Sequence, residues 1–317
     1  MTSSFGRARL LVNPRAGRGS VKEAWPAITR ALDEVRVEHD VTFTERPGHA
    51  TDTARAAVAH GCRFIAAVGG DGTVHEVVNG MMEEHQPGLV LGVVPSGSGC
   101  DFARTFGIPQ DPAAAVRHLA GDGLWGALDV GRVHYKTFGG EERARWFVNI
   151  AEAGIGADVV VTAAKMTSRL GARAYRLAAL KAIATFRPAR VRLSMHGRKA
   201  RGVKTGTQPG EMTHDGRFTM VVVANGQFFG GGLRVAPRAI PSDGMFDLLT
   251  GEGSKLDALR ALRKMPSGTH VPDRSFGEYL ADRVELGDGF MIEADGEALG
   301  RTPARFEIVP GAISLKI

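Results

Sequence analysis

Short apolar runs alternate with longer amphipathic stretches over the first half of the chain. The runs are rich in Val, Ile and Leu and end in Asn, Gly or Pro, as buried parallel strands do before their loops. The stretches between them have the spacing of helices. This alternation predicts a domain built on a parallel sheet. The expected strands cover 8–14, 39–44, 63–70 and 89–95, and the expected helices cover 21–35, 50–60 and 73–82.

The pattern changes from about Trp125 onwards. Alternating or fully apolar segments are now separated by turns, which favours an antiparallel β-sandwich. We expect helical interludes at about Asp158–Phe186 and Lys255–Lys264, and a polar, glycine-rich loop at Lys199–Gly216. The predicted fold class is α/β, with an N-terminal doubly wound parallel-sheet domain over 1–125 and a C-terminal antiparallel β-sandwich domain over 126–317. The extreme C-terminus could pack back on the first domain.

Composition narrows the class of protein. A length of 317 residues suits two domains, and 43% hydrophobic with 23% charged residues is typical of a globular chain. Cys62 and Cys100 lack the number and spacing of a disulfide framework or a metal site, so we expect free thiols in a reducing cytosol. We expect no secretory leader, and no apolar run approaches the ~20 residues of a membrane span. The net charge of +6 favours anionic partners such as phosphate, nucleic acid or acidic lipid.

A glycine-rich segment, Val68–Thr73, stands where an expected strand gives way to a helix. Its glycines let backbone N–H groups approach an anion at the helix N-terminus, so the segment predicts a phosphate-binding loop. It lacks the Gly-Lys-Ser/Thr of a P-loop, and its spacing is not that of a dinucleotide-binding GxGxxG. A plain strand-to-helix turn with Asp71 as the helix cap is the alternative.

Two more glycine-rich loops follow strands of the same expected sheet. Asn13–Gly19 offers two guanidinium groups to a phosphate, and Pro95–Arg104 has Asp101 at the start of a helix. Loops at the carboxyl ends of parallel strands meet at one edge, where ligands bind. Phosphoryl transfer needs a divalent cation, and Mg²⁺ prefers a few carboxylates plus water, so Asp71 and Asp101 form a candidate pair. An ordinary basic loop and a simple helix cap are the alternatives.

The chain resembles the diacylglycerol kinase catalytic family, including its bacterial soluble lipid kinases. The resemblance runs nearly end to end. It implies MgATP-dependent phosphorylation of a hydroxyl of diacylglycerol or a related membrane lipid, with a nucleotide-binding first domain, a lipid-substrate second domain and the nucleotide held between them. The segments that carry it, in the family's order and approximate spacing, are NPRAGRG, GGDGTVHEVVNG, PSGSGCDFARTFG, LDVGRV, FVNIAEAGIGADVV, NGQFFGGGLRVAPRAIPSDGMFDLL and EADGE.

The resemblance also implies roles for single residues. Asp71 and Asp101 match acidic positions near the catalytic metal, and Asp129 matches a further acid of that network. Glu297 matches the family's proposed general base, a role that suits the chemistry because a lipid hydroxyl is a poor nucleophile. A hairpin carboxylate that faces water is the plainer interpretation of Glu297. The residues expected to contact ATP are Asn13, Pro14, Arg15, Ala16, Gly17, Thr44, Gly70, Asp71, Gly72, Thr73, Val74, His75, Glu76 and Ser98.

A second metal position follows from the same resemblance. Similar bacterial kinases carry a structural Mg²⁺ at the turn that matches 241–245. The ligands here would be Asp243 through its side chain and Ile240 and Met245 through backbone oxygens, which are donors that suit a hard cation. An Asx turn without a metal fits the same residues.

The chain departs from the family pattern at GSGCD, residues 97–101, where GTxND is usual. Ser98 keeps the hydroxyl of the usual threonine, but Cys100 replaces an amide by a thiol that donates and accepts only weakly. His75 stands where Asn is common among the bacterial members. Loop order or lipid choice could therefore differ.

The stretch between Asp158 and Lys204 holds twelve Lys or Arg residues and a single acid, Asp158. On a helix, Lys165, Arg169, Arg173 and Arg176 would form one basic stripe beside apolar residues, which suits anionic lipid headgroups. An ordinary solvated helix face is the alternative. Nucleic acid is not an expected partner, because no recognised motif or aromatic interleaving occurs. We expect a cytoplasmic protein, peripheral at the inner membrane surface, with a homodimer as the default.

Two other functions stay open. NAD kinases share a GGDGT-type loop, so a soluble dinucleotide is an alternative acceptor, although the DFAR and NPRAGRG segments and the basic stripe favour lipid. A catalytically weak lipid- or nucleotide-binding regulator is the other alternative, suggested by Cys100 and Ser98. The sequence does not specify the lipid, because lipid pockets use generic apolar side chains.

Overall fold

The structure is a computed structural model that describes residues 6–96, 100–120, 123–165, 172–200 and 209–317. The chain divides into two compact units. Unit 1 comprises residues 1–130 and the C-terminal segment 310–317, and unit 2 comprises residues 131–309. Each unit is described by itself below.

Unit 1 is built on a parallel sheet with the strand order β2-β1-β3-β4-β14. β3 and β4 are buried at every position, which explains their unbroken apolar sequences. The last strand is the C-terminal segment, where Ser314 pairs with Val90. The bounds are β1 (Ala8–Val12), β2 (His39–Phe43), β3 (Phe64–Gly69), β4 (Val90–Pro95) and β14 (Glu297–Lys316), the last of which begins in unit 2.

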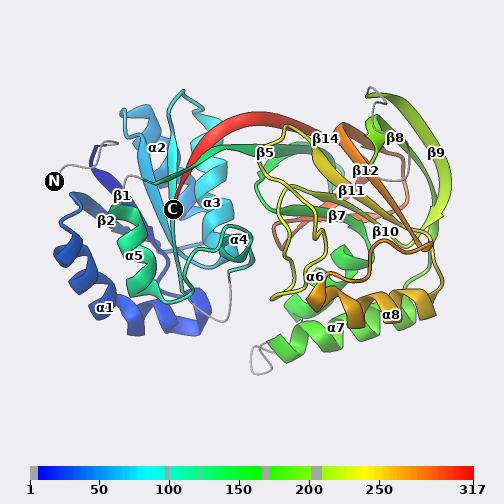
Figure 1. Cartoon of the computed structure of the whole chain (residues 1–317), viewed down its shortest axis with the longest axis horizontal. Helices are drawn as coiled ribbons and strands as arrows, with labels where there is room; N and C mark the ends of the chain where they lie inside the picture. The colour runs from blue at the N-terminus through cyan, green and yellow to red at the C-terminus, as the bar shows by residue number, and fades with distance from the viewer. Residues whose placement is uncertain (1–5, 97–99, 121–122, 166–171, 201–208) are drawn as a thin grey trace. The chain divides into compact units, whose positions relative to one another are not determined.

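Helices cover this sheet in two layers, as a doubly wound domain requires (Figure 1). α1 packs against α5 in one layer, and α2 packs against α3 in the other. The predicted α/β class and parallel sheet are confirmed. The helices are α1 (Ser20–Val35), α2 (His49–Ala59), α3 (Asp71–Glu83), α4 (Asp101–Thr105) and α5 (Pro112–Ala120), with a short 3₁₀ turn, η1 (Ala16–Gly19), before α1.

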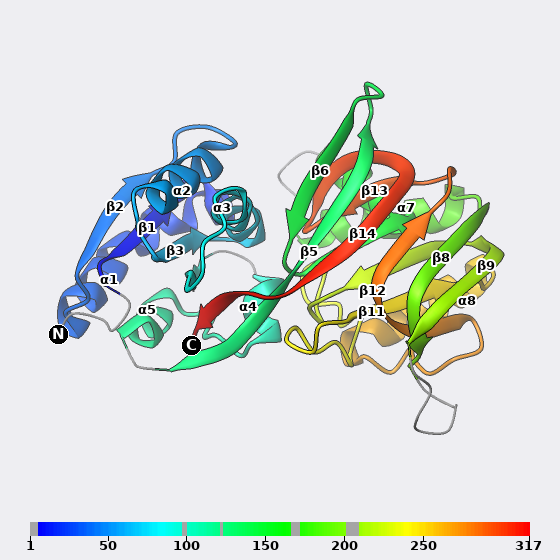
Figure 2. The same cartoon turned by 90° about the horizontal axis from the view of Figure 1, so that it is seen from above.

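Unit 2 is an antiparallel array with the strand order β14-β13-β7-β10-β11-β12-β8-β9, and β14 also pairs with β12 and β5. Figure 2 shows β5 and β6 as a long hairpin. The interior is aromatic, with Phe147 stacked on Phe246 and edge-on to Phe306. The bounds are β5 (Leu124–Thr137), β6 (Glu142–Phe147), β7 (Ile150–Gly154), β8 (Ala189–Lys199), β9 (Gly210–Phe218), β10 (Met220–Ala224), β11 (Phe246–Gly251), β12 (Phe276–Leu286) and β13 (Met291–Ala294).

Three helices lie against the same unit and enclose a second apolar cluster. They are α6 (Ile155–Lys165), α7 (Ala172–Thr185) and α8 (Lys255–Lys264), and a 3₁₀ turn, η3 (Met265–Ser267), follows α8. The predicted interlude at 158–186 is thus two helices. The predicted loop at 199–216 is wrong over its second half, because Gly210–Gly216 pair with β8 as part of β9. No helix in the described part of the chain is long and apolar enough to cross a membrane.

Gly80 fixes how closely α2 and α3 pack in unit 1. A Cβ atom at Gly80 would lie 2.2 Å from the carbonyl oxygen of Thr51 and 2.7 Å from the Cβ of Ala54. Contacts this short force a shift of the backbone. Only glycine therefore allows the observed separation of the two helices.

We predict that Gly80→Ala lowers the free energy of unfolding by roughly 1–3 kcal/mol, although alanine is the better helix former. Gly126→Ala is the control, since nothing lies within 4 Å of a Cβ atom at that position. Urea unfolding measures both. Equal stability of the two variants would contradict the close packing.

Candidate active site

The loops that leave the unit 1 strands lie at one edge of its sheet, because neighbouring parallel strands all end there. Backbone hydrogen bonds hold the first loops together. The N–H of Asn13, after β1, donates to the carbonyl of Val68 at 3.0 Å, and the N–H of Thr44, after β2, donates to the carbonyl of Val12 at 2.8 Å. The loop segments named from the sequence are therefore adjacent.

The Asn13 side chain joins the first loop to the glycine-rich loop. Its amide donates to the hydroxyl of Thr73 at 3.2 Å, and its carbonyl accepts the N–H of Arg15 at 3.0 Å. Residues 17–19 then adopt positive φ in succession, which only a glycine-rich sequence accommodates readily. Arg15 and Arg18 are both exposed on this loop. An anion at the loop would meet two cationic side chains on an ordered backbone.

The glycine-rich loop is open only at its tip. Gly69 allows a close backbone approach, since a Cβ there would lie 2.4 Å from the Thr73 hydroxyl, whereas nothing lies within 4 Å of a Cβ at Gly70. Gly70 and Asp71 are half-buried and Gly72 is exposed, while Thr73 is buried. The accessible part is therefore the backbone of 70–72 at the N-terminus of α3, which suits a phosphate group.

Asp71 follows β3, and its carboxylate holds the third loop, residues 95–104, which follows β4. One carboxylate oxygen accepts the S–H of Cys100 at 3.3 Å and the N–H of Phe102 at 3.0 Å, and the other accepts the N–H of Asp101 at 3.1 Å. These donors lie at the N-terminus of α4, where backbone N–H groups have no partner within the helix. Asp71 thus caps α4. Burial and the neighbouring Asp71 carboxylate raise the pKa of the Cys100 thiol, so Cys100 stays protonated.

The other two predicted acids also contact protein donors. Asp101 is almost fully buried and forms an ion pair with Arg104 at 2.9 Å. Asp129, on β5, is buried and accepts the N–H of Gly311 at 2.8 Å. The structure therefore brings Asp71 and Asp101 together and ties Asp129 to the C-terminal segment. The described residues contain no group of three or more His, Cys, Asp or Glu side chains arranged to hold a metal.

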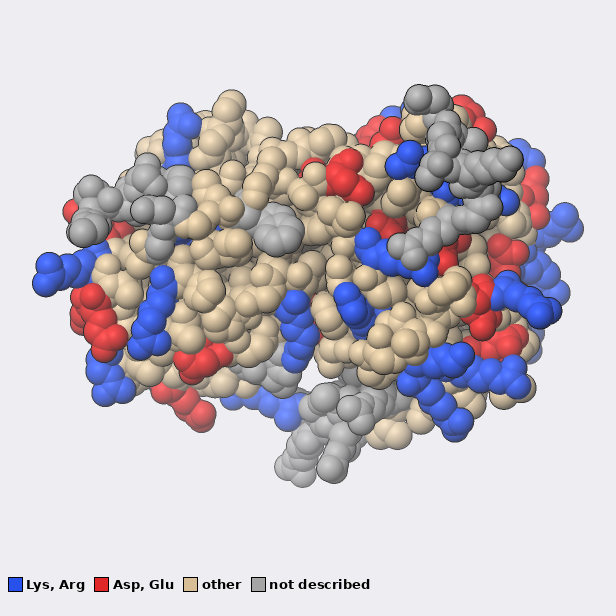
Figure 3. Space-filling model, viewed as in Figure 1, with Lys and Arg blue, Asp and Glu red and all other residues tan. Residues whose placement is uncertain are grey.

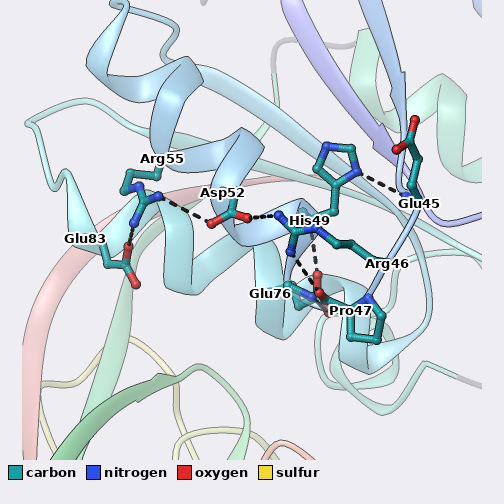
Figure 4. Close-up of polar contacts among 10 residues, drawn as sticks. Glu45, Arg46, Pro47, His49, Asp52, Arg55, Glu76 and Glu83 are labelled. Atoms are coloured by element: carbon teal, nitrogen blue, oxygen red, sulfur yellow. Dashed lines mark hydrogen bonds and ion pairs between the residues drawn. The ribbon is translucent and has the colours of Figure 1, made fainter.

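Three of the residues predicted to contact ATP face the interior of unit 1. Val74 and His75 are buried in α3, and the ring of His75 lies 3.3 Å from the amide of Asn79. The carboxylate of Glu76 accepts the N–H groups of Gly48 and Ala50 at 2.9 and 3.1 Å, which caps α2 (Figure 4). These side chains hold α3 in place, so a nucleotide would meet the start of α3 through backbone groups.

A chain of ion pairs continues along α2 beside the Thr44 loop (Figure 4). Arg46 contacts Asp52 at 2.6 Å, Asp52 contacts Arg55 at 3.4 Å, and Arg55 contacts Glu83 on α3 at 3.1 Å. The hydrogen bond from Arg46 lowers the pKa of Asp52. All four side chains are partly exposed, so these ion pairs contribute little to the stability of the protein. We assign them a role in ordering the loop before α2.

In unit 2, Glu297 follows a tight hairpin turn. β13 pairs with β14 through Ala294 and Glu297, which leaves Asp295 and Gly296 as the two-residue loop. Both have positive φ, at 50° and 89°, as a type I′ turn requires, and Asp-Gly is a preferred sequence for it. Glu297 is exposed at the end of this turn. Its carboxylate is therefore presented to solvent from a well-defined backbone.

Asp295, to which the sequence assigned no role, anchors that turn. It is buried, and its two carboxylate oxygens accept the backbone N–H groups of Val148, Asn149 and Ile150 at 3.0, 2.9 and 3.2 Å. Charge-assisted hydrogen bonds of this kind are about twice as strong as neutral ones. The Asp-Gly pair between two expected strands was the signal for this turn, but the partners of the carboxylate lie about 146 residues away.

Unit 2 also encloses an apolar cavity between its strands and helices. The volume accessible to water inside it is about 80 Å³, which is below the usual range for ligand pockets. The lining comes from α6, α7, α8 and the neighbouring strands. It includes Ile155, Val159, Met220, Phe229, Leu262 and Phe276.

The remaining predicted positions are placed as follows. Asp243 accepts the N–H of Met245 at 3.1 Å, as in an Asx turn, and the carbonyl of Ile240 accepts the N–H of Ser242 at 2.8 Å. Pro14 and Ala16 are half-buried in the first loop. Ser98 and the side chains of Lys165, Arg169, Arg173 and Arg176 lie outside the described part of the chain.

A parallel-sheet domain with glycine-rich loops at one edge, together with an antiparallel sandwich, is the two-domain architecture that the sequence predicts for a lipid kinase. Two family models agree. Residues 7–133 match the diacylglycerol kinase catalytic domain, and residues 149–317 match the YegS C-terminal NAD kinase beta sandwich-like domain. The chain belongs to the diacylglycerol kinase catalytic-domain family of lipid kinases.

Individual relatives extend over nearly the whole chain. A diacylglycerol kinase of Mycobacterium tuberculosis (strain ATCC 25618 / H37Rv) is 30% identical over 318 residues, covering 98% of this chain and 95% of its own. A diacylglycerol kinase of Bacillus subtilis (strain 168) is 28% identical, covering 95% and 92%. A crystal structure of a diacylglycerol kinase from Bacillus anthracis str. Sterne has the same fold, with a TM-score of 0.70 at 19% identity over 99% of this chain and 97% of that one.

We predict that Asp71→Asn loosens α4. Asparagine keeps one acceptor oxygen, and its amide would face a backbone donor, so buried N–H groups lose their partner at a cost of roughly 1–3 kcal/mol. Hydrogen exchange of the amides of 101–105 should accelerate before exchange elsewhere in unit 1. Asp33→Asn, an exposed position on α1, is the control. Unchanged protection of α4 in Asp71→Asn would show that the cap is unimportant.

Proposed function

We propose that this protein transfers the γ-phosphate of ATP to a hydroxyl of diacylglycerol or a related membrane lipid. Family membership along the whole chain supports a kinase reaction. The observation that favours a lipid acceptor is the cavity of unit 2, because its exposed lining is mostly apolar, whereas a soluble dinucleotide would need many polar partners. Acyl chains, in contrast, gain about 0.8 kcal/mol for each CH₂ group that they bury.

The nucleotide phosphates are proposed to bind at the sheet edge of unit 1. The backbone of 70–72 would donate N–H groups at the N-terminus of α3, and Arg15 and Arg18 would neutralise phosphate charge. Thr44 and the segment 13–17 would complete this contact, together with Ser98. Fixed donors and cations of this kind stabilise the charge that moves onto the phosphate oxygens during transfer.

The acidic residues of unit 1 fit a Mg²⁺ ion that keeps most of its ligands from water and nucleotide. Mg²⁺ in kinases is usually held by one or two carboxylates together with substrate phosphates. Asp71 and Asp101 are adjacent and could serve in this way, although each already accepts or pairs with protein donors. When bound, the ion would neutralise phosphate charge. The predicted second Mg²⁺ at Asp243 stays a prediction, since the Asx turn accounts for the local hydrogen bonds.

Glu297 is proposed as the general base. As the lipid hydroxyl attacks the γ-phosphorus, a new P–O bond forms, the bond to the β-phosphate oxygen breaks, and the hydroxyl proton passes to the Glu297 carboxylate while ADP leaves. The exposed position of Glu297 on an anchored turn supports this role. A mobile carboxylate would lose the alignment that proton transfer needs.

Peripheral contact with a lipid surface is the way in which the substrate is proposed to reach the cavity. α8 lines the cavity and is amphipathic and basic, with Lys255, Arg260, Arg263 and Lys264 against one acid, Asp257. Lys and Arg side chains gather over α8 in the space-filling view (Figure 3). Such a helix favours anionic headgroups.

The homodimer expected from the sequence is a separate proposal, which sedimentation of the purified protein would test.

The test of the function is a transfer assay with γ-labelled ATP and Mg²⁺ on a panel of lipids in mixed micelles, with NAD as a soluble acceptor. We expect label in diacylglycerol or a related lipid and none in NADP. Formation of NADP, or tight ATP binding without transfer to any lipid, would overturn the proposal in favour of the corresponding alternative.

We predict that Glu297→Gln lowers kcat by about 10²- to 10⁴-fold and leaves the KM for ATP nearly unchanged, because only the proton acceptor is lost. Glu141→Gln, an exposed carboxylate on the β5–β6 hairpin, serves as the matched control and should retain activity. A Glu297→Gln enzyme with the native kcat would exclude Glu297 as the base.

A further inference from the structure

Two glutamates lie side by side in the interior of unit 2, where neither is needed to bind a phosphate. Glu152 is in the middle of β7, and Glu293 is directly opposite it in the antiparallel register with β13. Residues opposite one another in such a pair point to the same face, with Cβ atoms about 4.5–5.5 Å apart. Glu152 is 3% exposed and Glu293 is fully buried. The two side chains therefore start from neighbouring points on one face of the sheet, both are shielded from water, and the charge of Glu152 acts on Glu293.

Each carboxyl group holds the backbone of a different functional segment. Glu152 accepts the N–H of Gly156 at 2.7 Å, at the start of α6, and it lines the apolar cavity. Glu293 accepts the N–H of Gly296 at 2.9 Å, within the turn that presents Glu297. The remaining oxygen of Glu293 is buried and has no hydrogen-bond partner in the described part of the chain. The pair thus connects the start of the cavity wall to the turn of the proposed base.

The charged groups around Glu152 and Glu293 do not neutralise the negative charge of the pair. Asp158 on α6, Asp295 in the turn and Glu297 on β14 act on it and are all acidic. The positive charge of Arg301 acts on Asp158. Asp257 lies on α8 across the cavity, where it already accepts a hydrogen bond from Ser254 and forms an ion pair with Arg260. On β10, the residue opposite Glu152 is Val222. Two adjacent carboxylates in such surroundings cannot both ionise readily.

Protonation states follow from this geometry. Burial, with a smaller effect from Asp158, raises the pKa of Glu152 to about 7. Burial and the Glu152 charge raise the pKa of Glu293 further above its usual value. The protons belong to the pair as a unit, because interacting carboxyl groups titrate together. The pair is therefore protonated in acid and acquires charge as the pH rises through neutrality.

We infer that Glu152 and Glu293 form a proton-sharing positioning pair that holds the Glu297 turn and the first turn of α6 in their working arrangement. While the pair shares protons, each carboxyl group accepts its glycine N–H without repulsion from its neighbour. When both groups ionise, two like charges in an apolar interior repel one another, and the two glycine contacts are no longer held together. The pair moves no proton to or from the substrate. The role of Glu297 in this inference rests on the proposed function.

The stability of the protein should report the pair directly. Both pKa values are raised in the folded chain, so the stabilisation is fully present below about pH 4.5, the usual value for glutamate, and is lost as the pH rises through about 7. We expect the Tm of the native protein to fall over this range by roughly 5 °C more than that of Glu152→Gln/Glu293→Gln, because glutamine mimics the neutral acid. Glu285→Gln, an exposed change on β12, should behave as the native protein.

Kinetics separate positioning from a merely structural role. In the native enzyme, kcat should decline on the alkaline side of its profile, and Glu152→Gln/Glu293→Gln should extend the plateau by at least about one pH unit. Glu293→Leu removes the acceptor of the Gly296 N–H, so kcat should fall roughly ten- to hundredfold with an unchanged KM for ATP, whereas Glu293→Gln should retain activity. If the leucine and glutamine variants lose activity alike and the pH profile is unmoved, the positioning role is wrong.

Nuclear magnetic resonance distinguishes this inference from the proposed function. If the native protein phosphorylates no lipid, the amide signals of Gly156 and Gly296 still report the pair. Their shifts should titrate together in the native protein and stay constant with pH in Glu152→Gln/Glu293→Gln. Independent titration of the two amides, or none, would overturn the pairing whatever reaction the protein catalyses.

Discussion

Single carboxylates that collect several backbone N–H groups hold both units of this protein in order. Asp71 accepts the N–H groups of Asp101 and Phe102 and the thiol of Cys100, and Asp295 accepts the N–H groups of 148–150. Each carboxylate is solvated by donors that are fixed by the fold. Loss of such an acceptor leaves buried N–H groups unpaired, which costs more than the bond itself contributed. The arrangement of α4 and of the Glu297 turn depends on these two residues.

The pattern of apolar residues predicted the architecture well, because periodicity reflects which face of an element is buried. The fully apolar runs at 64–69 and 90–95 are buried parallel strands, and the glycine-rich loops after β1, β3 and β4 are at one sheet edge. The error at 210–216 has a physical cause. Polar side chains alternate there on an exposed strand, and backbone pairing with β8 forms the strand without an apolar signal.

The candidate site was predicted less completely, because a motif names a residue but not its partner. Asp71 was identified as a helix cap or a metal contact from its own neighbours, whereas its partners follow a different strand. Glu76 was grouped with ATP contacts by its place in the motif, yet its carboxylate caps α2. The Glu152–Glu293 pair depends on the register between β7 and β13, which residues 141 positions apart in the chain cannot reveal. Side-chain chemistry is readable from sequence, but juxtaposition requires the fold.

The acids of unit 2 stand in two different environments. Glu297 is exposed, while Glu152 and Glu293 are buried and have raised pKa values. Only a hairpin turn separates Glu293 from Glu297, yet β13 is buried at Glu293 and Ala294 whereas the first two residues of β14 are exposed. An apolar cavity begins beside Glu152.

We propose that the apolar interior of unit 2 selects the acceptor. The most direct measurement is kcat/KM for a series of diacylglycerols of increasing acyl length, presented at equal mole fraction. We expect a severalfold rise for each early methylene, since each buried CH₂ contributes about 0.8 kcal/mol, followed by a plateau when the cavity is full. A value of kcat/KM that is independent of chain length, or equal for glycerol, would contradict it.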